Sequence, residues 1–204
     1  MGGLLDCTNT IPSPLCSVIT PIALDHTAVL GDTIEEITNQ KCGIIKEKSF
    51  TVIGKQTHRA IERQIVKYCV EHHNIYHFAE DCKFKVISST LDGTTVKYKG
   101  RKLNLHLAGL HQIENLRTAL KTIEVLIDEY FYPITKEDIE YGIAKAKNPA
   151  RFELLSKNPR VILDGAHNPN GMESFPKSAE EYTSGKRVLI MGMPKDKDIS
   201  HSLD

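Results

Sequence analysis

Residues 161–170 read VILDGAHNPN and place a polar cluster directly after a short apolar run. The apolar residues predict a buried strand, and the proline and asparagine that close the stretch predict the start of a helix. In open α/β sheets, ligands bind where strands end at their carboxyl side. Asp164, His167 and Asn168 are therefore candidate ligand-binding residues, and the alternative interpretation is a purely structural turn.

The same alternation of apolar strands and amphipathic helices extends toward the N-terminus. Shorter alternating runs between residues 83 and 107, with glycine turns at 92–93 and 99–100, predict three antiparallel strands. Longer apolar periodicities predict the other elements, which are strands at 17–22, 50–53 and 75–78 and helices at 33–41, 58–72 and 113–131.

Helix-capping residues and a candidate domain boundary refine the predicted order of helices and strands. Asp32 is the expected N-cap of the helix at 33–41, and Thr135 with Asp138 forms a capping-box variant that opens a further helix. The Lys-Asn-Pro run at 147–149 is a candidate domain boundary. After it, buried strands at 161–163 and 188–191, with a helix near 172–182 between them, predict the start of a parallel α/β unit.

Composition narrows the class of protein. Lys and Arg number 26 and Asp and Glu also number 26, so the chain has no overall positive charge with which to bind nucleic acid. We expect no membrane span, because no apolar run approaches the roughly 18 residues that one requires. Five scattered cysteines form no C-x-x-C pair, which favours reduced thiols and a cytoplasmic protein.

Three further clusters carry side chains of chemical interest. His26 follows a strand beside an acid and is a candidate metal ligand, or else a hydrogen-bonded loop histidine. Gln112 lies at the entry of the helix at 113–131, where polar side chains face a ligand or simply cap the helix. Arg151 follows the candidate boundary, and it either binds phosphate or pairs with surface acids such as Glu153.

Known catalytic signatures are otherwise missing from the sequence. It contains no G-x-x-x-x-G-K-[ST] phosphate loop, no nucleophile elbow and no H-E-x-x-H motif. Composition and spacing alone therefore reach an α/β ligand-binding protein, with a nucleotide and a metal ion among its candidate ligands.

Five ordered motifs resemble the folylpolyglutamate synthase and dihydrofolate synthase branch of the Mur ligase family. Residues 2–9, 19–46 and 109–119 are similar to its G-G-R-L-D-A-T-N, its L-D-H-x-x-x-L-G-x-T with K-A-G-I-I-K, and its G-x-H-Q-x-x-N-x-x-T-A. Residues 149–153 are similar to P-G-R-F-E and residues 163–169 to L-D-G-A-H-N-P, and 192–198 also resembles G-M-x-x-D-K-D.

The resemblance implies an α/β fold in two parts. Residues 1–147 would be part of the central ATPase domain, a mixed sheet with helices plus a small antiparallel sheet. Residues 148–204 would begin the Rossmann-like C-terminal glutamate ligase domain. The implied reaction is the ATP-dependent addition of L-glutamate to the glutamyl tail of a tetrahydrofolate through an acyl phosphate, with ATP and Mg²⁺ as cofactors and folate and L-glutamate as substrates.

The resemblance also implies roles for individual residues. His26 would be a magnesium ligand, and Lys41 would be carbamylated and lie near a second metal ion. The nucleotide would lie near Gln112 and Asn115, with Arg151 on its phosphates. Three residues of the DGAHNP stretch complete the set, namely Asp164 on the ribose and His167 and Asn168 near the nucleotide and the glutamate.

Departures from the family pattern set limits on these expectations. Leu4, Cys7, Cys42 and Ala150 replace an arginine, two alanines and a glycine of the motifs. The family's phosphate loop and its E-x-G-L-G-G glutamate would lie before Met1, so we expect a chain truncated at both ends and inactive alone. Exposed sheet edges would then favour self-association. The alternatives are another Mur-type peptide ligase and a non-catalytic remnant.

Overall fold

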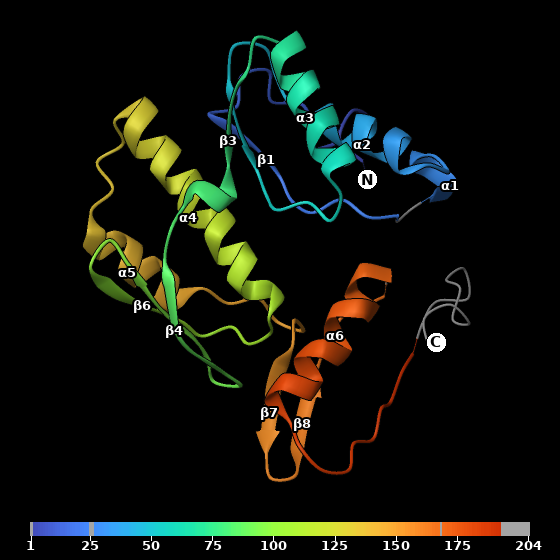
Figure 1. The fold of residues 1–204 in the computed structure, drawn as a ribbon, viewed down its shortest axis with the longest axis vertical. Helices are drawn as coiled ribbons and strands as arrows, with labels where there is room; N and C mark the ends of the chain where they lie inside the picture. Colours follow the sequence, from blue (N-terminus) through green and yellow to red (C-terminus); the bar gives the residue numbers. More distant parts are fainter. Residues whose placement is uncertain (1, 25–26, 168, 193–204) are drawn as a thin grey trace. The chain divides into compact units, whose positions relative to one another are not determined.

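The computed structural model describes residues 2–24, 27–167 and 169–192. Contacts divide the chain into two compact units, residues 1–83 with 114–134 and residues 84–113 with 135–204 (Figure 1). The second unit thus combines the small antiparallel sheet with the C-terminal residues, whereas the sequence places a boundary at 147–148. That domain boundary stays a prediction.

The first unit contains the three expected strands, which pair in parallel. β1 (Cys16–Ile19), β2 (Phe50–Ile53) and β3 (Ile75–Phe78) pair in the order β1-β2-β3. Each connection between them carries helices, α1 (Thr27–Leu30) and α2 (Ile34–Cys42) before β2 and α3 (Arg59–Glu71) before β3. Such crossovers are what parallel pairing requires, and they leave all three carboxyl ends at one edge of the sheet.

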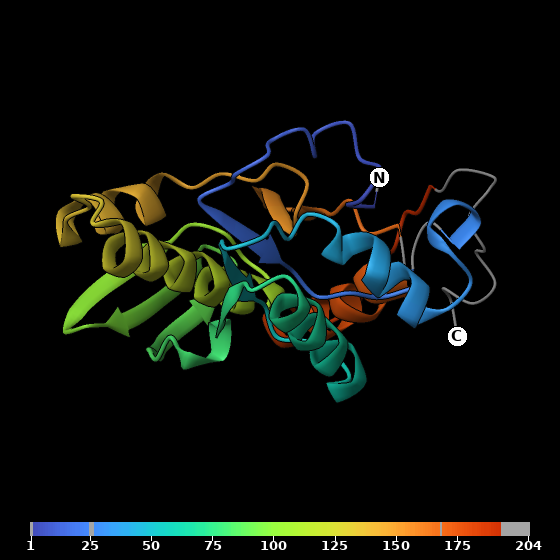
Figure 2. The same ribbon diagram turned by 90° about the horizontal axis from the view of Figure 1, so that it is seen from above.

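Helices cover both faces of this sheet. On one face, Ile37 of α2 and Ile65 of α3 belong to a buried cluster with Ile19 and Ile53 of the strands. On the other face, Val125 of α4 (His111–Tyr130) packs with Val52. Tyr130 also meets Phe50 edge-on at a ring separation of 5.4 Å. Successive residues of a strand point to opposite faces of the sheet, and helices bury both faces in this helix–sheet–helix layering, which Figure 2 shows from above.

The cap of α2 differs from the prediction by one residue. Thr33, rather than Asp32, is the N-cap, and its hydroxyl accepts a hydrogen bond from the backbone N–H of Glu36. The Glu36 carboxylate in turn accepts from the Thr33 backbone N–H at 3.2 Å. This reciprocal pair satisfies two N–H groups, whereas an aspartate one residue earlier satisfies one at most. The capping box of Thr135 is confirmed.

The second unit begins with the predicted antiparallel sheet. β4 (Lys85–Thr90), β5 (Gly93–Tyr98) and β6 (Arg101–Leu105) pair in that order. The helix α5 (Lys136–Lys145) contacts β6. A 3₁₀ turn (Ala79–Asp81) ends the first unit's last strand before this sheet starts.

The prediction of a parallel α/β unit after residue 147 is wrong for its strands, because neither predicted strand takes part in parallel pairing. β8 (Arg160–Leu163) forms an antiparallel hairpin with β7 (Glu153–Lys157), a strand that the sequence did not indicate, and α6 (Pro169–Tyr182) follows. Leu163 is 44% exposed rather than buried, and residues 188–191 form no strand, with Ile190 93% exposed. An apolar run becomes a strand only where a neighbouring strand completes its hydrogen bonds, and residues 188–191 lack such a ladder with the described strands.

The helices can also be compared with the requirements of a membrane span. None of those within the described ranges combines the length and the apolar character that a span requires.

Candidate functional site

Three loops of the second unit converge around the DGAHNP stretch. Residues 109–112 enter α4, residues 150–153 precede β7, and residues 164–167 follow β8. The backbone N–H of Gly165 donates to the carbonyl of Ala150 at 2.8 Å, and that of Leu110 donates to the buried hydroxyl of Ser178 in α6 at 3.2 Å. The family resemblance implied that these motifs form one nucleotide-binding site, and in the structure the three loops lie together.

Asp164 holds two of these loops in place. One carboxylate oxygen accepts the backbone N–H of Phe152 at 2.6 Å, and the other accepts that of Ala166 at 2.7 Å. Hydrogen bonds from N–H groups to a carboxylate are short and strong. Asp164 therefore fixes the turn before α6 and ties it to the Arg151 loop, a structural role additional to the predicted ribose contact.

The backbone of the Arg151 loop is bent sharply. Ala150 and Phe152 both have positive φ angles, 56° and 52°, a region that residues with a Cβ seldom occupy. Phe152 is 1% exposed and meets Phe175 of α6 edge-on at 5.8 Å. Burial of this ring, together with the hydrogen bond from Ala150 N to the Glu153 carboxylate at 2.8 Å, holds the bend.

The bend presents Arg151 to solvent. Its side chain is exposed and, within the described residues, has no hydrogen-bond or ion-pair partner. One terminal nitrogen lies 4.0 Å from the position that a Cβ on Gly165 would take. The acid that might have paired with it, Glu153, is hydrogen-bonded to the backbone instead. The structure thus favours the anion-binding interpretation of Arg151 over a surface ion pair.

His167 is oriented by the same turn. Its Nδ1 lies 2.7 Å from the carbonyl oxygen of Gly165, which only accepts, so Nδ1 carries the hydrogen. In the neutral ring this leaves a lone pair on Nε2, and the side chain is exposed. Nε2 is accordingly free to accept a proton or a hydrogen bond from a ligand.

His111 lies at the entry of α4, next to the candidate residue Gln112. Burial and the nearby Arg151 guanidinium lower the pKa of His111, against the opposing effect of Asp164. Its Nδ1 is buried and lacks a hydrogen-bond partner in the described part of the chain. Gly109 makes room for this ring, since a Cβ there would lie 2.7 Å from Cε1. The sequence left two interpretations open for the polar residues here, a ligand contact and a helix cap.

Gln112 and Asn115 lie on the first turns of α4. They are three residues apart and therefore share a face of the helix. Gln112 is 2% exposed, whereas Asn115 is exposed. Asn115 lies at the surface, where a nucleotide could reach it, whereas Gln112 lies in the interior.

Lys41 belongs to the first unit, in the last turn of α2. The N-terminal loop packs tightly against this turn, with Leu4 N donating to the Gln40 carbonyl at 2.8 Å. Gly3 and Gly43 allow the approach, because a Cβ on Gly43 would lie 2.5 Å from the Leu4 Cα. The two motifs that contain G-G and K-C-G-I-I-K are therefore one packed structure, and Lys41 is half-buried within it.

The predicted metal site has little support from the described residues. His26 and Asn168 lie outside them, so their predicted roles stay predictions. Within the described ranges, no group of three or more His, Cys, Asp or Glu side chains is arranged to hold a metal ion. Lys41 in its unmodified form is a cation and does not bind Mg²⁺, which prefers oxygen ligands.

Comparison with known proteins defines the class first. Residues 150–203 match the family described as Mur ligase, glutamate ligase domain. This match contains the Arg151 loop, the Asp164 turn and α6, which are the parts that build the site of the second unit. These residues thus resemble the glutamate ligase domain of Mur ligases.

Relatives over the full chain then identify the branch. The chain is 33% identical to a folylpolyglutamate synthase of Lacticaseibacillus casei over 211 residues, covering 100% of this chain and 49% of that protein. It is 32% identical to a dihydrofolate synthase/folylpolyglutamate synthase of Bacillus subtilis, covering 97% and 47%. A solved FPGS–AMPPCP–folate complex aligns with a TM-score of 0.80 at 30% identity, covering 91% and 46%.

The chain is similar over essentially its full length to proteins of the folylpolyglutamate synthase and dihydrofolate synthase branch of the Mur ligase family. This confirms the resemblance and its α/β fold class. The chain spans about half the length of the relatives it matches.

Proposed function

We propose that the residues of this chain serve an ATP-dependent ligase that joins L-glutamate to the glutamyl tail of a folate. The observation that carries the proposal is Arg151, an exposed guanidinium without an acidic partner in the described part of the chain, on a loop fixed by Asp164. A planar guanidinium binds phosphate oxygens in two places at once, so this loop suits a nucleotide. The solved relative with AMPPCP and folate supports the substrate class.

The chemistry assigns distinct tasks to the residues. ATP supplies the phosphoryl group that converts the folate carboxylate into an acyl phosphate, and Mg²⁺ accompanies ATP. Arg151 would hold phosphate oxygens, while Asp164 keeps the loop rigid and contacts the ribose through its unused lone pairs. His167 would offer Nε2 to the incoming amine, with Asn168 and Asn115 beside the nucleotide. His26 and a carbamylated Lys41 would bind the metal ion.

We also propose that the 204 residues alone turn over little. A phosphate loop supplies backbone N–H groups and a lysine to the triphosphate, and this sequence contains no such motif. An isolated Arg151 does not replace those contacts. A cytoplasmic location is part of the same proposal, because the substrates are metabolites and the five cysteines include no C-x-x-C pair.

The proposed role of the Arg151 loop is tested by nucleotide binding. Titration of MgADP into the isotope-labelled chain, followed by NMR, should shift the amide signals of residues 150–153 and 164–167. Arg151→Gln should abolish these shifts. Arg160→Gln removes another exposed arginine of the same unit, which has no partner among the described residues, and should leave the shifts intact. Equal behaviour of the two variants would contradict the proposal.

Turnover is a separate measurement. ADP release would be followed with MgATP, a reduced folate and L-glutamate, with a full-length relative as the positive control. Absence of turnover by a folded chain supports the need for a phosphate loop. Folate-dependent turnover that Lys41→Ala abolishes would show instead that other residues of this chain hold the triphosphate.

A further inference from the structure

Three lysines stand side by side across the antiparallel sheet of the second unit. Lys85 of β4 pairs directly with Lys97 of β5, and Lys97 pairs with Lys102 of β6. Directly paired residues of antiparallel strands project from the same face. All three side chains are exposed. Because neighbouring strands lie about 4.8 Å apart, the cation row (Lys85, Lys97, Lys102) extends over roughly 10 Å.

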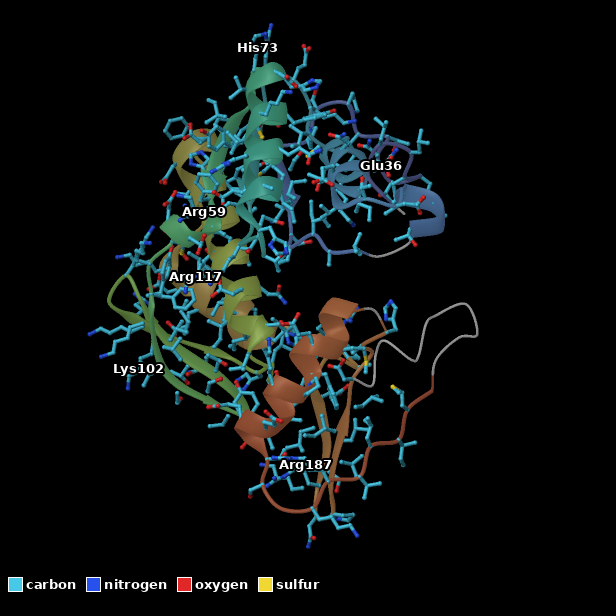
Figure 3. All side chains as sticks on the ribbon, turned by 45° about the vertical axis from the view of Figure 1, so that its right-hand side comes forward. Glu36, Arg59, His73, Lys102, Arg117 and Arg187 are labelled. Carbon is cyan, nitrogen blue, oxygen red and sulfur yellow. The ribbon has the colours of Figure 1, made fainter. Side chains whose placement is uncertain are left out.

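The cation row occupies the face that points away from α5. Val96 and Leu103 alternate with the lysines along their strands and are 0% and 1% exposed, on the side where α5 contacts β6. Arg101 is paired with Glu137 and Glu140 of that helix. Figure 3 shows Lys102 on the outer side of the sheet.

Nothing in the described residues neutralises this row. Like charges directly opposite each other destabilise a sheet, and no carboxylate or hydrogen bond of the described residues compensates Lys85, Lys97 or Lys102. Other cations of the same unit do have acidic partners, since Lys157 lies 2.8 Å from Asp92. A row of unneutralised ammonium groups at strand spacing is suited to a ligand that carries several negative charges in series.

The chemistry of this face favours carboxylates over nucleic acid. The next row of paired residues consists of Ser88, Thr95 and Asn104, and the hydroxyl of Thr95 donates to the Asn104 side-chain oxygen at 2.9 Å. The outward positions in these two rows of paired residues thus carry hydroxyl, amide and ammonium groups, without aromatic rings or arginines. Surfaces for single-stranded nucleic acid combine cations with stacking aromatic rings, and arginine is the preferred residue for phosphate.

We propose that the cation row binds the glutamate tail of the folate. This proposal rests on the proposed function for the identity of its ligand. Each glutamate that is added keeps one carboxylate free, whichever of its carboxyl groups is joined, so the tail is a series of carboxylates. Binding there would hold a lengthened tail on the protein and would favour long tails over short ones.

Binding is measured without ATP, so the result does not depend on ligase activity. Fluorescence anisotropy with fluorescein-labelled γ-linked pentaglutamate would be compared with labelled glutamate, an α-linked pentaglutamate and an oligothymidylate of equal charge. The γ-linked probe should bind the full chain most tightly, and its affinity should fall as salt rises. Lys97→Gln should weaken binding about three- to fivefold, and the triple Lys85, Lys97, Lys102→Gln variant more than about tenfold.

Lys136→Gln provides the matched control. Lys136 is an exposed lysine of the same unit that lies on α5, outside the cation row, and its removal should leave binding unchanged. Lys97→Gln should also raise the melting temperature of the free chain by about one to three degrees, because it relieves repulsion, and this separates lost binding from lost folding.

Three outcomes would overturn the proposal. Unchanged binding in the triple variant would mean that the row does not hold the tail. Tighter binding of the oligothymidylate would assign the face to nucleic acid, and tighter binding of the α-linked peptide would assign it to an acidic protein segment. A failure of the nucleotide titration with intact tail binding would contradict the proposed ligase role and leave the cation row in place.

Discussion

Removing the carboxylate of Asp164 should release two loops at once. Its two oxygens accept the backbone N–H groups of Phe152 and Ala166 at 2.6 and 2.7 Å. Hydrogen bonds to a charged group contribute about 1.5–3 kcal/mol each. Asp164→Ala loses both hydrogen bonds and should lower the free energy of unfolding by about 3 kcal/mol, after allowance for partial exposure of the site. Asp164→Asn keeps one acceptor and turns its NH₂ group toward the other N–H, which should cost about 2 kcal/mol.

Amide hydrogen exchange measures this loss of stability directly at the backbone amides of Phe152 and Ala166. A local loss of about 2 kcal/mol corresponds to a roughly thirtyfold faster exchange of the released amide. The Phe152 and Ala166 amides should both accelerate in Asp164→Ala, and one of them most strongly in Asp164→Asn. The amide of Val96, in the β5–β6 pairing, should keep its rate.

The control replaces another carboxylate of the same unit. Glu181 of α6 is exposed and lacks a described partner, so Glu181→Gln should leave both amides protected. Unchanged exchange at Phe152 and Ala166 in Asp164→Ala would refute the idea that this carboxylate holds the Arg151 loop. The same result would weaken the proposed presentation of Arg151 to a nucleotide.

Three further perturbations test the packing and the charge. Gly43→Ala should cost about 1–3 kcal/mol in urea unfolding, because its Cβ would lie 2.5 Å from the Leu4 Cα, whereas Gly142→Ala in α5 meets nothing within 4 Å and should stabilise by about 0.5–1 kcal/mol. Ala150→Gly should stabilise the chain by about 0.5–1 kcal/mol, since Ala150 has a φ of 56°; a loss in thermal melting would contradict this reasoning. Burial of His77 lowers its pKa, and the positive charge of Lys121 lowers it further. The contribution of neutral His77 to the free energy of unfolding should therefore be fully present above the unfolded pKa of 6.5 and be lost as the pH falls through the folded pKa. His77→Gln should flatten that acid limb in circular dichroism, and a limb of unchanged slope would exclude His77 as its source.

The local sequence pattern was sufficient to locate several helices and strands. The helix at 33–41 was visible because a helix buries one face at a fixed period. The strands at 50–53 and 75–78 were visible as short apolar runs, which are typical of a parallel sheet covered on both faces. The prediction shifted by one residue at Thr33, where the choice between two adjacent cap residues depends on which hydroxyl or carboxylate reaches the third N–H of the helix.

The sequence by itself indicated the family that this chain resembles and the candidate residues of its site. The motifs around Arg151, Asp164 and His167 indicated the ligase family, because the chemistry of a site restricts residue types at given positions. Tertiary structure alone decided what those side chains do locally. It made Asp164 a bridge between two loops, left Arg151 without an acidic partner in the described part and placed His111 against Gly109.

Strand pairing was likewise decided by the tertiary structure. Residues 160–163 and 188–191 have similar apolar patterns, yet only the first run forms a strand, in a hairpin with residues 153–157. The lysines at 85, 97 and 102 are scattered in sequence and become one row through register alone. Hydrogen bonding between strands joins residues distant along the chain, and no local pattern encodes which partner a strand will find.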